Sequence, residues 1–347
     1  MFNYSAQLEA YESERVNLSE ATREDLYQKR QSNRNRLKGN LPTKIRISDS
    51  QFIPQGSMAI RTTVQEVDCD YDIDDGVWLY EEDLKEGPLD LFNMSVAGVQ
   101  SMICEALKDD KFKKQPEILG NCVRVYYAEG YHVDVPAFRI FNAGTEKEHQ
   151  ELAGENGWRA SDPTEINRWF EGRVQELNRV QDDAGGQFRR MIRLMKRFAR
   201  SRRDKWDMPN GLKLTMLSEE CFNAVKGRDD EAFVGLLERI QARLDQSLVV
   251  YNRAQAQQPQ DQLTKTTSDK NMIELKEHAQ EALTQLQVLG KDNCTKKAAR
   301  KAWDWVFQSG GFFDDFDDKH GDDDDTRGIA PVAPTAPFVK KETRFGE

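Results

Sequence analysis

The spacing of apolar positions divides the chain into two unlike parts. Short alternating stretches between residues 45 and 138 predict strands, one of them over 67–80, and a helix is expected over 95–107. From Asp162 onward, apolar residues recur at helical spacing, and Asp162-Pro163-Thr164-Glu165 supplies the cap, the proline and the glutamate that open a helix. The pattern therefore predicts an α+β fold in which an α+β lobe is followed by a helical C-terminal lobe.

A polar helix precedes these two lobes, and a polar tail follows them. The helix is expected from Ser19 to Lys38, with Asn17 or Ser19 as its cap. We therefore divide the chain into an N-terminal helical segment (1–40), an α+β lobe (41–160), a helical lobe (161–310) and a tail (311–347). The tail is acidic and contains prolines, so it is expected to be disordered.

Composition narrows the class of protein. The five cysteines form no Cys-x-x-Cys pair and the four histidines are scattered, which argues against a zinc site or a disulfide framework and favours the cytoplasm. No apolar stretch approaches the roughly 20 residues that span a bilayer, so no membrane association is expected. The net charge of −10 is uneven: eight aspartates crowd into 314–325, while 184–203 holds eight basic residues and no acidic one. This asymmetry predicts that the body of the protein binds an anion.

Four aspartates alternate along the predicted strand 67–80, at positions 68, 70, 72 and 74. A period of two places all four on one face of the strand, where their charges repel one another. A divalent cation would remove this repulsion, and Mg²⁺, with Mn²⁺ as a possible substitute, prefers carboxylate and phosphate oxygens. Two such ions can stabilise a phosphoryl transfer. The alternative is an exposed acidic edge strand without a ligand.

Three further features favour a nucleotide site. Gln55-Gly56-Ser57 could bring backbone N–H groups close to a phosphate, although most Gly-Ser pairs are ordinary turns. Asp134 lies between two valines on a predicted strand and could face the same site, or solvent. Arg189, Arg193, Lys196 and Arg200 form a basic stripe along a predicted helix, from which Lys196 could reach a triphosphate. A solvated basic face is the alternative for this stripe.

Three motifs in order resemble a known family. Phe52-Ile53-Pro54-Gln55-Gly56-Ser57, Tyr71-Asp72-Ile73-Asp74-Asp75-Gly76 and His132-Val133-Asp134-Val135-Pro136 resemble the DNA polymerase β-like nucleotidyltransferases. More narrowly, the chain is similar over about residues 40–310 to the CD-NTases, the bacterial relatives of cyclic GMP–AMP synthase. The resemblance implies that Asp72, Asp74 and Asp134 are the catalytic, metal-binding residues. It assigns nucleotide contacts to Gln55, Gly56, Ser57, Lys196, Asn210 (a serine in many relatives) and Thr215.

The resemblance also implies an activity. A ribose hydroxyl would attack the α-phosphate of a second nucleotide, and repetition and closure would give a cyclic di- or trinucleotide messenger in anti-phage defence. The pattern is most similar to the CdnC clade, which implies ATP as substrate and a HORMA-domain protein as regulatory partner. Double-stranded DNA is a possible co-activator, held by Arg30, Arg34 and Lys38 and by residues 197–203. The alternatives are a template-independent RNA nucleotidyltransferase and a non-catalytic nucleotide- or nucleic-acid-binding protein.

Overall fold

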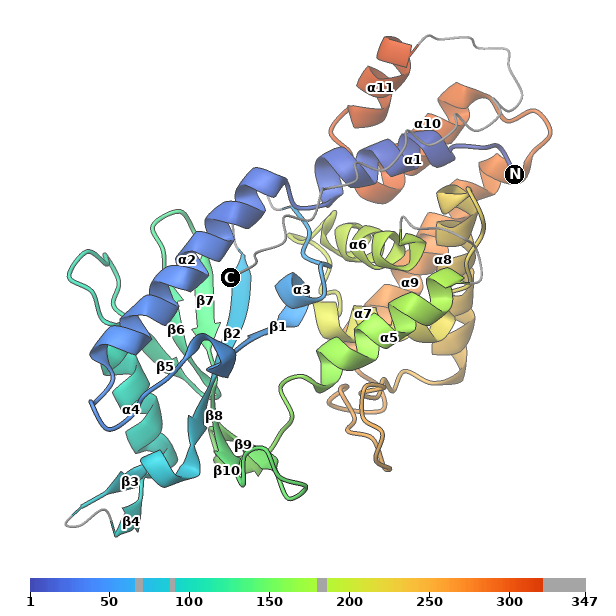
Figure 1. Cartoon of the computed structure of the whole chain (residues 1–347). Coiled ribbons are helices and arrows are strands. Elements are labelled where there is room, and N and C mark those ends of the chain that lie inside the picture. Colours follow the sequence, from blue (N-terminus) through green and yellow to red (C-terminus); the bar gives the residue numbers. More distant parts are fainter. Residues whose placement is uncertain (66–70, 88–90, 180–185, 321–347) are drawn as a thin grey trace.

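The computed structural model describes residues 1–65, 71–87, 91–179 and 186–320. Asp68, Asp70 and the tail from residue 321 lie outside the described residues, so the predictions made for them stay predictions. Figure 1 shows a β-sheet lobe and a helical lobe, with a long N-terminal helix running along the sheet lobe. The α+β class and the helical C-terminal lobe predicted from the sequence are confirmed. Within the described residues, no helix combines the length and apolarity needed to cross a membrane.

One mixed sheet carries the first lobe, in the order β10-β9-β8-β2-β7-β6-β5, with β1 paired to the other side of β2. The central strand β2 (Asp72–Tyr80) runs parallel to β7 along its first half and parallel to β8 along its second half. The remaining strands are β1 (Phe52–Gln55), β5 (Glu117–Leu119), β6 (Cys122–Tyr126), β7 (His132–Val135), β8 (Ala137–Phe141), β9 (His149–Gly154) and β10 (Gly157–Ala160), with a separate ribbon of β3 (Lys85–Glu86) and β4 (Phe92–Asn93).

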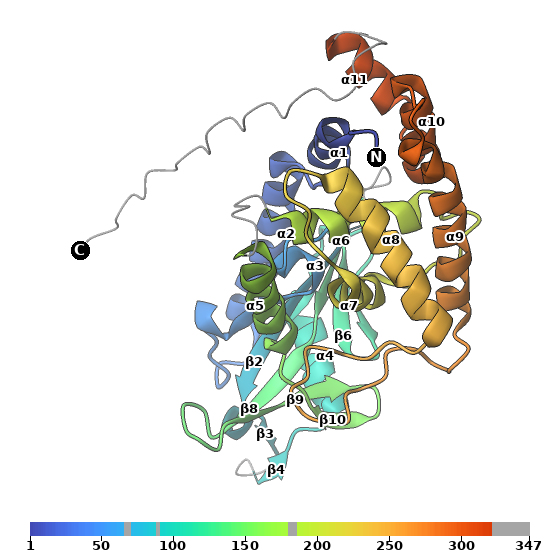
Figure 2. The ribbon, with the colours of Figure 1, turned by 90° about the vertical axis from the view of Figure 1, so that its right-hand side faces the viewer.

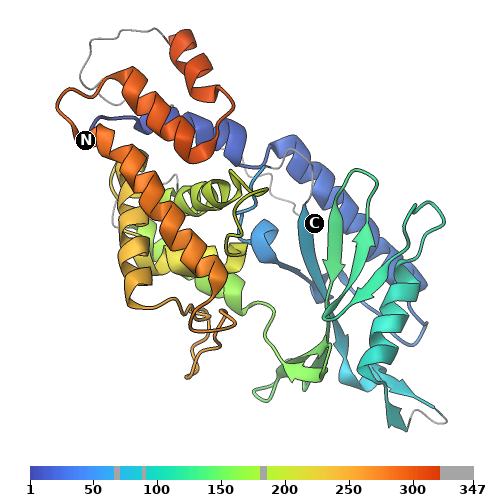
Figure 3. The same ribbon diagram turned by 180° about the vertical axis from the view of Figure 1, so that it is seen from behind.

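Helices α2 (Glu20–Asn40) and α4 (Val96–Leu107) pack on each other and on one face of this sheet (Figure 3). Their apolar side chains, such as Leu37 and Ile103, join the buried strand residues in one core. Ser19 caps α2, as predicted, by accepting a hydrogen bond from the Thr22 amide. The helix runs two residues further than expected, because Gly39 remains helical and the chain turns extended only at Leu41.

The helical lobe consists of α5 (Glu165–Arg179), α6 (Gln187–Arg200), α7 (Gly211–Cys221), α8 (Asp229–Gln246), α9 (Lys270–Leu286) and α10 (Lys296–Phe307) (Figure 2). Its core gathers large side chains from several helices, among them Phe198, Phe233 and Trp303. The apolar face predicted for the basic helix is confirmed, because Phe188, Met191, Ile192, Met195 and Phe198 of α6 are all buried. This face anchors α6 and turns its basic stripe toward the sheet lobe.

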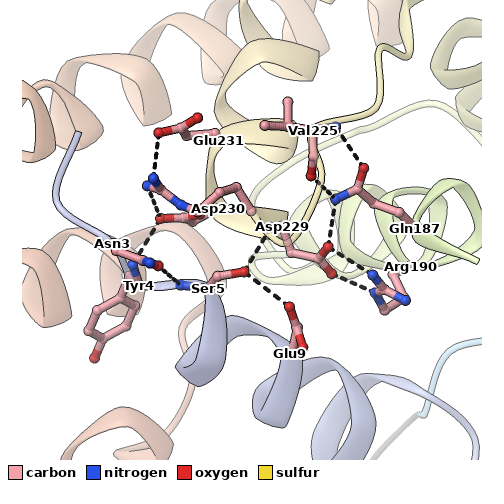
Figure 4. A network of polar contacts seen from close by, with 11 residues as sticks. Asn3, Tyr4, Ser5, Glu9, Gln187, Arg190, Val225, Asp229, Asp230 and Glu231 are labelled. Atoms are coloured by element: carbon pink, nitrogen blue, oxygen red, sulfur yellow. Dashed lines mark hydrogen bonds and ion pairs between the residues drawn. The ribbon is translucent and has the colours of Figure 1, made fainter. Parts of the chain in front are cut away.

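The N-terminal segment contains an additional helix that the sequence reading missed. Helix α1 (Ser5–Tyr11) continues into a π-helical turn (Glu12–Val16) and packs on the helical lobe. Figure 4 shows the polar network that fixes it: Asp230 accepts from the Tyr4 amide, and the Ser5 hydroxyl accepts from the Asp229 amide. Asp229 in turn accepts from Arg190 of α6. The N-terminal segment therefore contacts both lobes, through α1 on one and α2 on the other.

The expectation of a disordered tail from residue 311 is wrong for residues 312–320, which form a helix. Helix α11 (Phe312–His320) packs against α1. Phe312 and Phe313 are buried, and both rings contact Tyr11. The acidic residues that follow suggested disorder, because the local composition does not show that Phe312 and Phe313 are buried against a distant helix.

Candidate active site

The sheet brings Asp72, Asp74 and Asp134, here called the carboxylate triad, to one place. Asp74 of β2 lies directly beside Asp134 of β7 in the parallel register, and Asp72 lies beside His132. Neighbours in a parallel pair point to the same side of a sheet, as do residues two apart on one strand. All three carboxylates therefore lie on one face, as expected from the alternation in the sequence.

The three carboxylates differ in their surroundings. The side chain of Asp72 is 59% exposed, whereas Asp134 is buried and Asp74 is partly buried. Burial, followed by the charges of Asp134 and Asp72, raises the pKa of Asp74 to about 6 against the opposing effect of Arg124. Burial, followed by the charge of Asp134, raises the pKa of the neighbouring Cys122 thiol to about 12, so the thiol is protonated at pH 7. The site therefore offers carboxylate oxygens rather than a thiolate.

Arg124 of β6 is a site residue that the sequence reading missed. It lies opposite Asp134 in the antiparallel register, and its guanidinium binds both oxygens of that carboxylate, at 2.7 Å each. The Nη2 atom of Arg124, which donates to Oδ2 of Asp134, also lies 3.2 Å from Oδ1 of Asp72. The alternation of Val123 and Val125 with polar neighbours was the available signal, because it places Arg124 on the face opposite the valines.

The donor set of the triad suits a hard divalent cation, but the side chains are not arranged around one. Among the residues the structure describes, no group of three or more His, Cys, Asp or Glu side chains converges as metal ligands would. One guanidinium nitrogen lies between Asp72 and Asp134 instead. The chemistry of the donors fits Mg²⁺, whereas the arrangement requires the guanidinium and the carboxylates to move.

Gly56 meets the triad at close range. Its φ of 64° is in the left-handed region, and a Cβ placed on it would lie 2.0 Å from Oδ2 of Asp74. Only glycine tolerates both conditions. Gln55, the last residue of β1, pairs with Asp74 across the strands, and Ser57 opens the short helix α3 (Gly56–Ala59) with Gly56. The hydroxyl of Ser57 lies 2.9 Å from that of Thr63. The predicted Gln55-Gly56-Ser57 motif therefore lies directly beside the carboxylates.

Asp75 lies on the opposite face and belongs to a different interaction. It is 2% exposed and accepts a 2.7 Å hydrogen bond from Nε of Arg34 on α2. This agrees with the resemblance, which assigns the metal-binding role to Asp72 and Asp74 and not to Asp75. Two basic residues of the expected DNA surface have protein partners here, since Arg34 forms a buried ion pair with Asp75 and Lys38 pairs with Asp49, and their contact with DNA stays a prediction. Arg30 lies over the Tyr27 ring, 4.6 Å from its centroid.

Most of the basic stripe of α6 docks on the sheet lobe, and only Arg200 at its end is exposed. Three of its side chains donate to the carbonyl oxygens of residues 60–62, which directly follow α3. Lys196 is 5% exposed and also donates to the Thr62 hydroxyl at 2.8 Å. The three bonds run from Arg189 Nε to Ile60 O (3.3 Å), from Arg193 Nη1 to Arg61 O (2.9 Å) and from Lys196 Nζ to Thr62 O (3.1 Å). In this conformation Lys196 reaches no open surface, so direct contact with a triphosphate would require it to move.

Asn210 and Thr215, the other predicted nucleotide contacts, have structural partners on α7. Asn210 is the N-cap of this helix and accepts from the Lys213 amide at 3.0 Å. Thr215 is buried, and its hydroxyl donates to the Gly211 carbonyl at 2.7 Å. Lys196 lies against Gly211, with its Cε 3.3 Å from a Cβ placed there. Direct contacts of Asn210 and Thr215 with a nucleotide stay predictions.

Comparison with known proteins identifies the first lobe. Residues 50–138 match the family model described as "Cyclic GMP-AMP synthase DncV-like, nucleotidyltransferase domain", a span that contains the whole triad. Among solved structures, Vibrio cholerae DncV cyclic AMP-GMP synthase, in complex with the linear intermediate 5′ pppA(3′,5′)pG, has a TM-score of 0.66 and 15% identity, covering 88% of this chain and 95% of DncV.

Two further structures show that the likeness extends through the helical lobe. The Bradyrhizobium diazoefficiens CD-NTase CdnG, in complex with GTP, has a TM-score of 0.65 and 15% identity, covering 91% of this chain and 98% of CdnG. Escherichia coli DncV, in its 3′-deoxy GTP bound form, has a TM-score of 0.64 and 15% identity, covering 88% and 96%. At these identities the structures establish a shared fold. The family match alone assigns residues 50–138 to the DncV-like nucleotidyltransferase domain.

Proposed function

We propose that this chain is a metal-dependent nucleotidyltransferase that joins nucleoside triphosphates and closes the product into a ring. The observation that carries the proposal is the carboxylate triad on adjacent strands beside the Gly56 turn, inside the span that matches the DncV-like domain. A binding protein without catalysis has no need for three clustered carboxylates that, after burial, raise the pKa of Asp74 by their repulsion.

The reaction that suits this site is attack by a ribose hydroxyl on an α-phosphate. A new P–O bond forms, the α–β phosphoanhydride bond breaks, pyrophosphate leaves, and the hydroxyl proton passes to a carboxylate of the site. Asp72, Asp74 and Asp134 would hold Mg²⁺, or Mn²⁺ in its place, which supplies charge neutralisation for the phosphates. Gly56 lets the backbone pass close to the triad, where its neighbours can approach a phosphate.

For the product, we propose a cyclic oligoadenylate made from ATP, with three nucleotides favoured over two. The basis is the resemblance to the CdnC clade. DncV, with the same fold, is named a cyclic AMP-GMP synthase, and CdnG was solved with GTP. A mixed or guanine-containing product is therefore the competing outcome, and base identity has to be measured.

For regulation, we propose a HORMA-domain protein as activator in anti-phage signalling, with double-stranded DNA as a second activator. The remaining candidates for phosphate contact are basic residues such as Arg200 and Arg203, which are exposed on or beside α6. An assay of the full chain alone, with the partner, with DNA and with both tests this proposal. Full activity of the isolated chain at physiological salt contradicts it.

The decisive experiment incubates the full chain with each labelled nucleoside triphosphate and Mg²⁺, followed by nuclease digestion and mass measurement of the product. A cyclic product supports the proposal, and a linear extension of added RNA supports a template-independent RNA nucleotidyltransferase. Nucleotide binding without turnover, in the presence of the regulatory partner, indicates a non-catalytic binding protein. The Asp74→Asn variant is the negative control, since it keeps the shape of the side chain and removes its charge.

A further inference from the structure

Arg124 has an unusual position for a cation in a site that is proposed to bind metal. Its guanidinium uses two nitrogens on both oxygens of Asp134, and one of these nitrogens also approaches Asp72. Asp134 and Asp72 lie on different strands, so a cation that contacts both joins β7 to β2. A metal ion bridging these carboxylates would need the same oxygens.

The charges support this reading of the geometry. The triad carries three negative charges when it is ionised, and Arg124 offsets one of them. Two negative charges remain, so the triad still attracts a divalent ion. A guanidinium is a permanent cation that pairs with carboxylates through two parallel hydrogen bonds. It therefore stabilises the neighbouring strands β2, β6 and β7 whenever no other cation is bound, and it occupies the oxygens that a metal requires.

We propose that Arg124 is an internal counter-cation of the carboxylate triad, and that a divalent metal ion must displace its guanidinium from Asp134 and Asp72 in order to bind. This inference rests on the proposed metal-dependent function and adds a competition within the site. It explains why the triad side chains do not converge among the described residues. Metal binding then carries a built-in cost, so the site loads fully only when an additional ligand, such as a nucleotide phosphate, helps to hold the metal.

The chain offers a matched control for Arg124. Arg139 of β8 lies opposite Glu151 of β9 in an antiparallel register and binds its carboxylate at 2.7 Å. This pair, like Arg124 and Asp134, joins two neighbouring antiparallel strands, yet its carboxylate is outside the triad. Arg139→Gln therefore removes a cross-strand ion pair of the sheet without removing charge from the triad.

The test is a Mn²⁺ titration of the full chain without nucleotide, followed by electron paramagnetic resonance. Arg124→Gln is expected to bind Mn²⁺ about tenfold more tightly than the wild type or better, because a like charge has left the site. Arg124→Lys, which keeps the charge, should stay within about threefold of the wild type, and Arg139→Gln should match it. Equal or weaker binding by Arg124→Gln overturns the inference. If no variant binds Mn²⁺ even with ATP present, the proposed function fails instead.

A second measurement needs no variant that removes the charge. In deuterated wild-type protein, the Nε–H resonance of Arg124, identified by its loss in Arg124→Lys, should shift as Mg²⁺ is added. The Arg139 resonance should not move over the same range. An Arg124 resonance that stays fixed while Mg²⁺ saturates the site would show that metal binds without displacing the guanidinium.

Discussion

Lys196 provides the sharpest test of how the helical lobe meets the sheet lobe. Its ammonium group is buried at the interface and donates to the carbonyl and the hydroxyl of Thr62. Burial, followed by the nearby charges of Arg200 and Arg193, lowers the pKa of Lys196 from 10.5 to about 7. Replacing Lys196 with methionine keeps most of the shape and removes the titrating group.

The expected effect on stability follows from the pKa. Because the folded pKa of Lys196 lies below the unfolded value, the folded protein binds this proton less tightly. Lys196 therefore destabilises the fold by a penalty that depends on pH. The penalty is absent above pH 10.5, where the stability is fully present, and it grows as the pH is lowered until it reaches its full size below about pH 7. At about 1.4 kcal/mol per pKa unit, the penalty is about 4 kcal/mol at pH 7 and about 1.4 kcal/mol at pH 9.5. Losing the two hydrogen bonds costs about 1–2 kcal/mol.

Lys196→Met should consequently raise the free energy of unfolding by about 2 kcal/mol at pH 7 and change it little at pH 9.5. Urea unfolding of both proteins at the two pH values measures this difference. Lys205→Met, at an exposed position after α6, is the control and should show no pH-dependent difference. An equal effect of Lys196→Met at both pH values would refute the reasoning, because a buried charge would then not be responsible.

Three further predictions concern the site itself. Asp72→Asn and Asp74→Asn should each reduce synthesis by about a thousandfold, equivalent to about 4 kcal/mol of transition-state stabilisation, while circular dichroism stays unchanged. Asp70→Asn should be milder. Equal loss at Asp70 and Asp72 would show that the assignment of Asp72 and Asp74 as the metal-binding pair is wrong. Gly56→Ala should abolish synthesis, since its Cβ would meet Asp74. The left-handed backbone alone should lower the stability by about 1–2 kcal/mol. The control Gly39→Ala in α2 has open space for its Cβ and should be neutral or stabilising. Lys196→Ala should weaken nucleotide binding in calorimetric titrations more than Arg197→Ala. Lys196 binds Thr62, whose amide donates to the Ser57 carbonyl, whereas Arg197 contacts Tyr11. The opposite order would reject a role for Lys196 near the nucleotide.

The sequence by itself determined the features that depend on local periodicity. A period of two on a strand is fixed by backbone geometry, so Asp72 and Asp74 had to share a face wherever that strand lay. The apolar face of α6 and the Ser19 cap follow from helix geometry in the same way. These local rules were sufficient for the α+β class and for the order of the motifs.

Only the tertiary structure decided which charges meet. Arg124 lies at the triad because of the register between β6 and β7, and Arg34 is neutralised by Asp75, 41 residues away in the chain. Lys196 appeared in the sequence as part of an open basic stripe, but the docking of α6 on residues 60–62 buries it. Burying a charge without a partner is costly, whereas leaving it in water is not. The role of each basic residue therefore depends on the partners that long-range packing supplies.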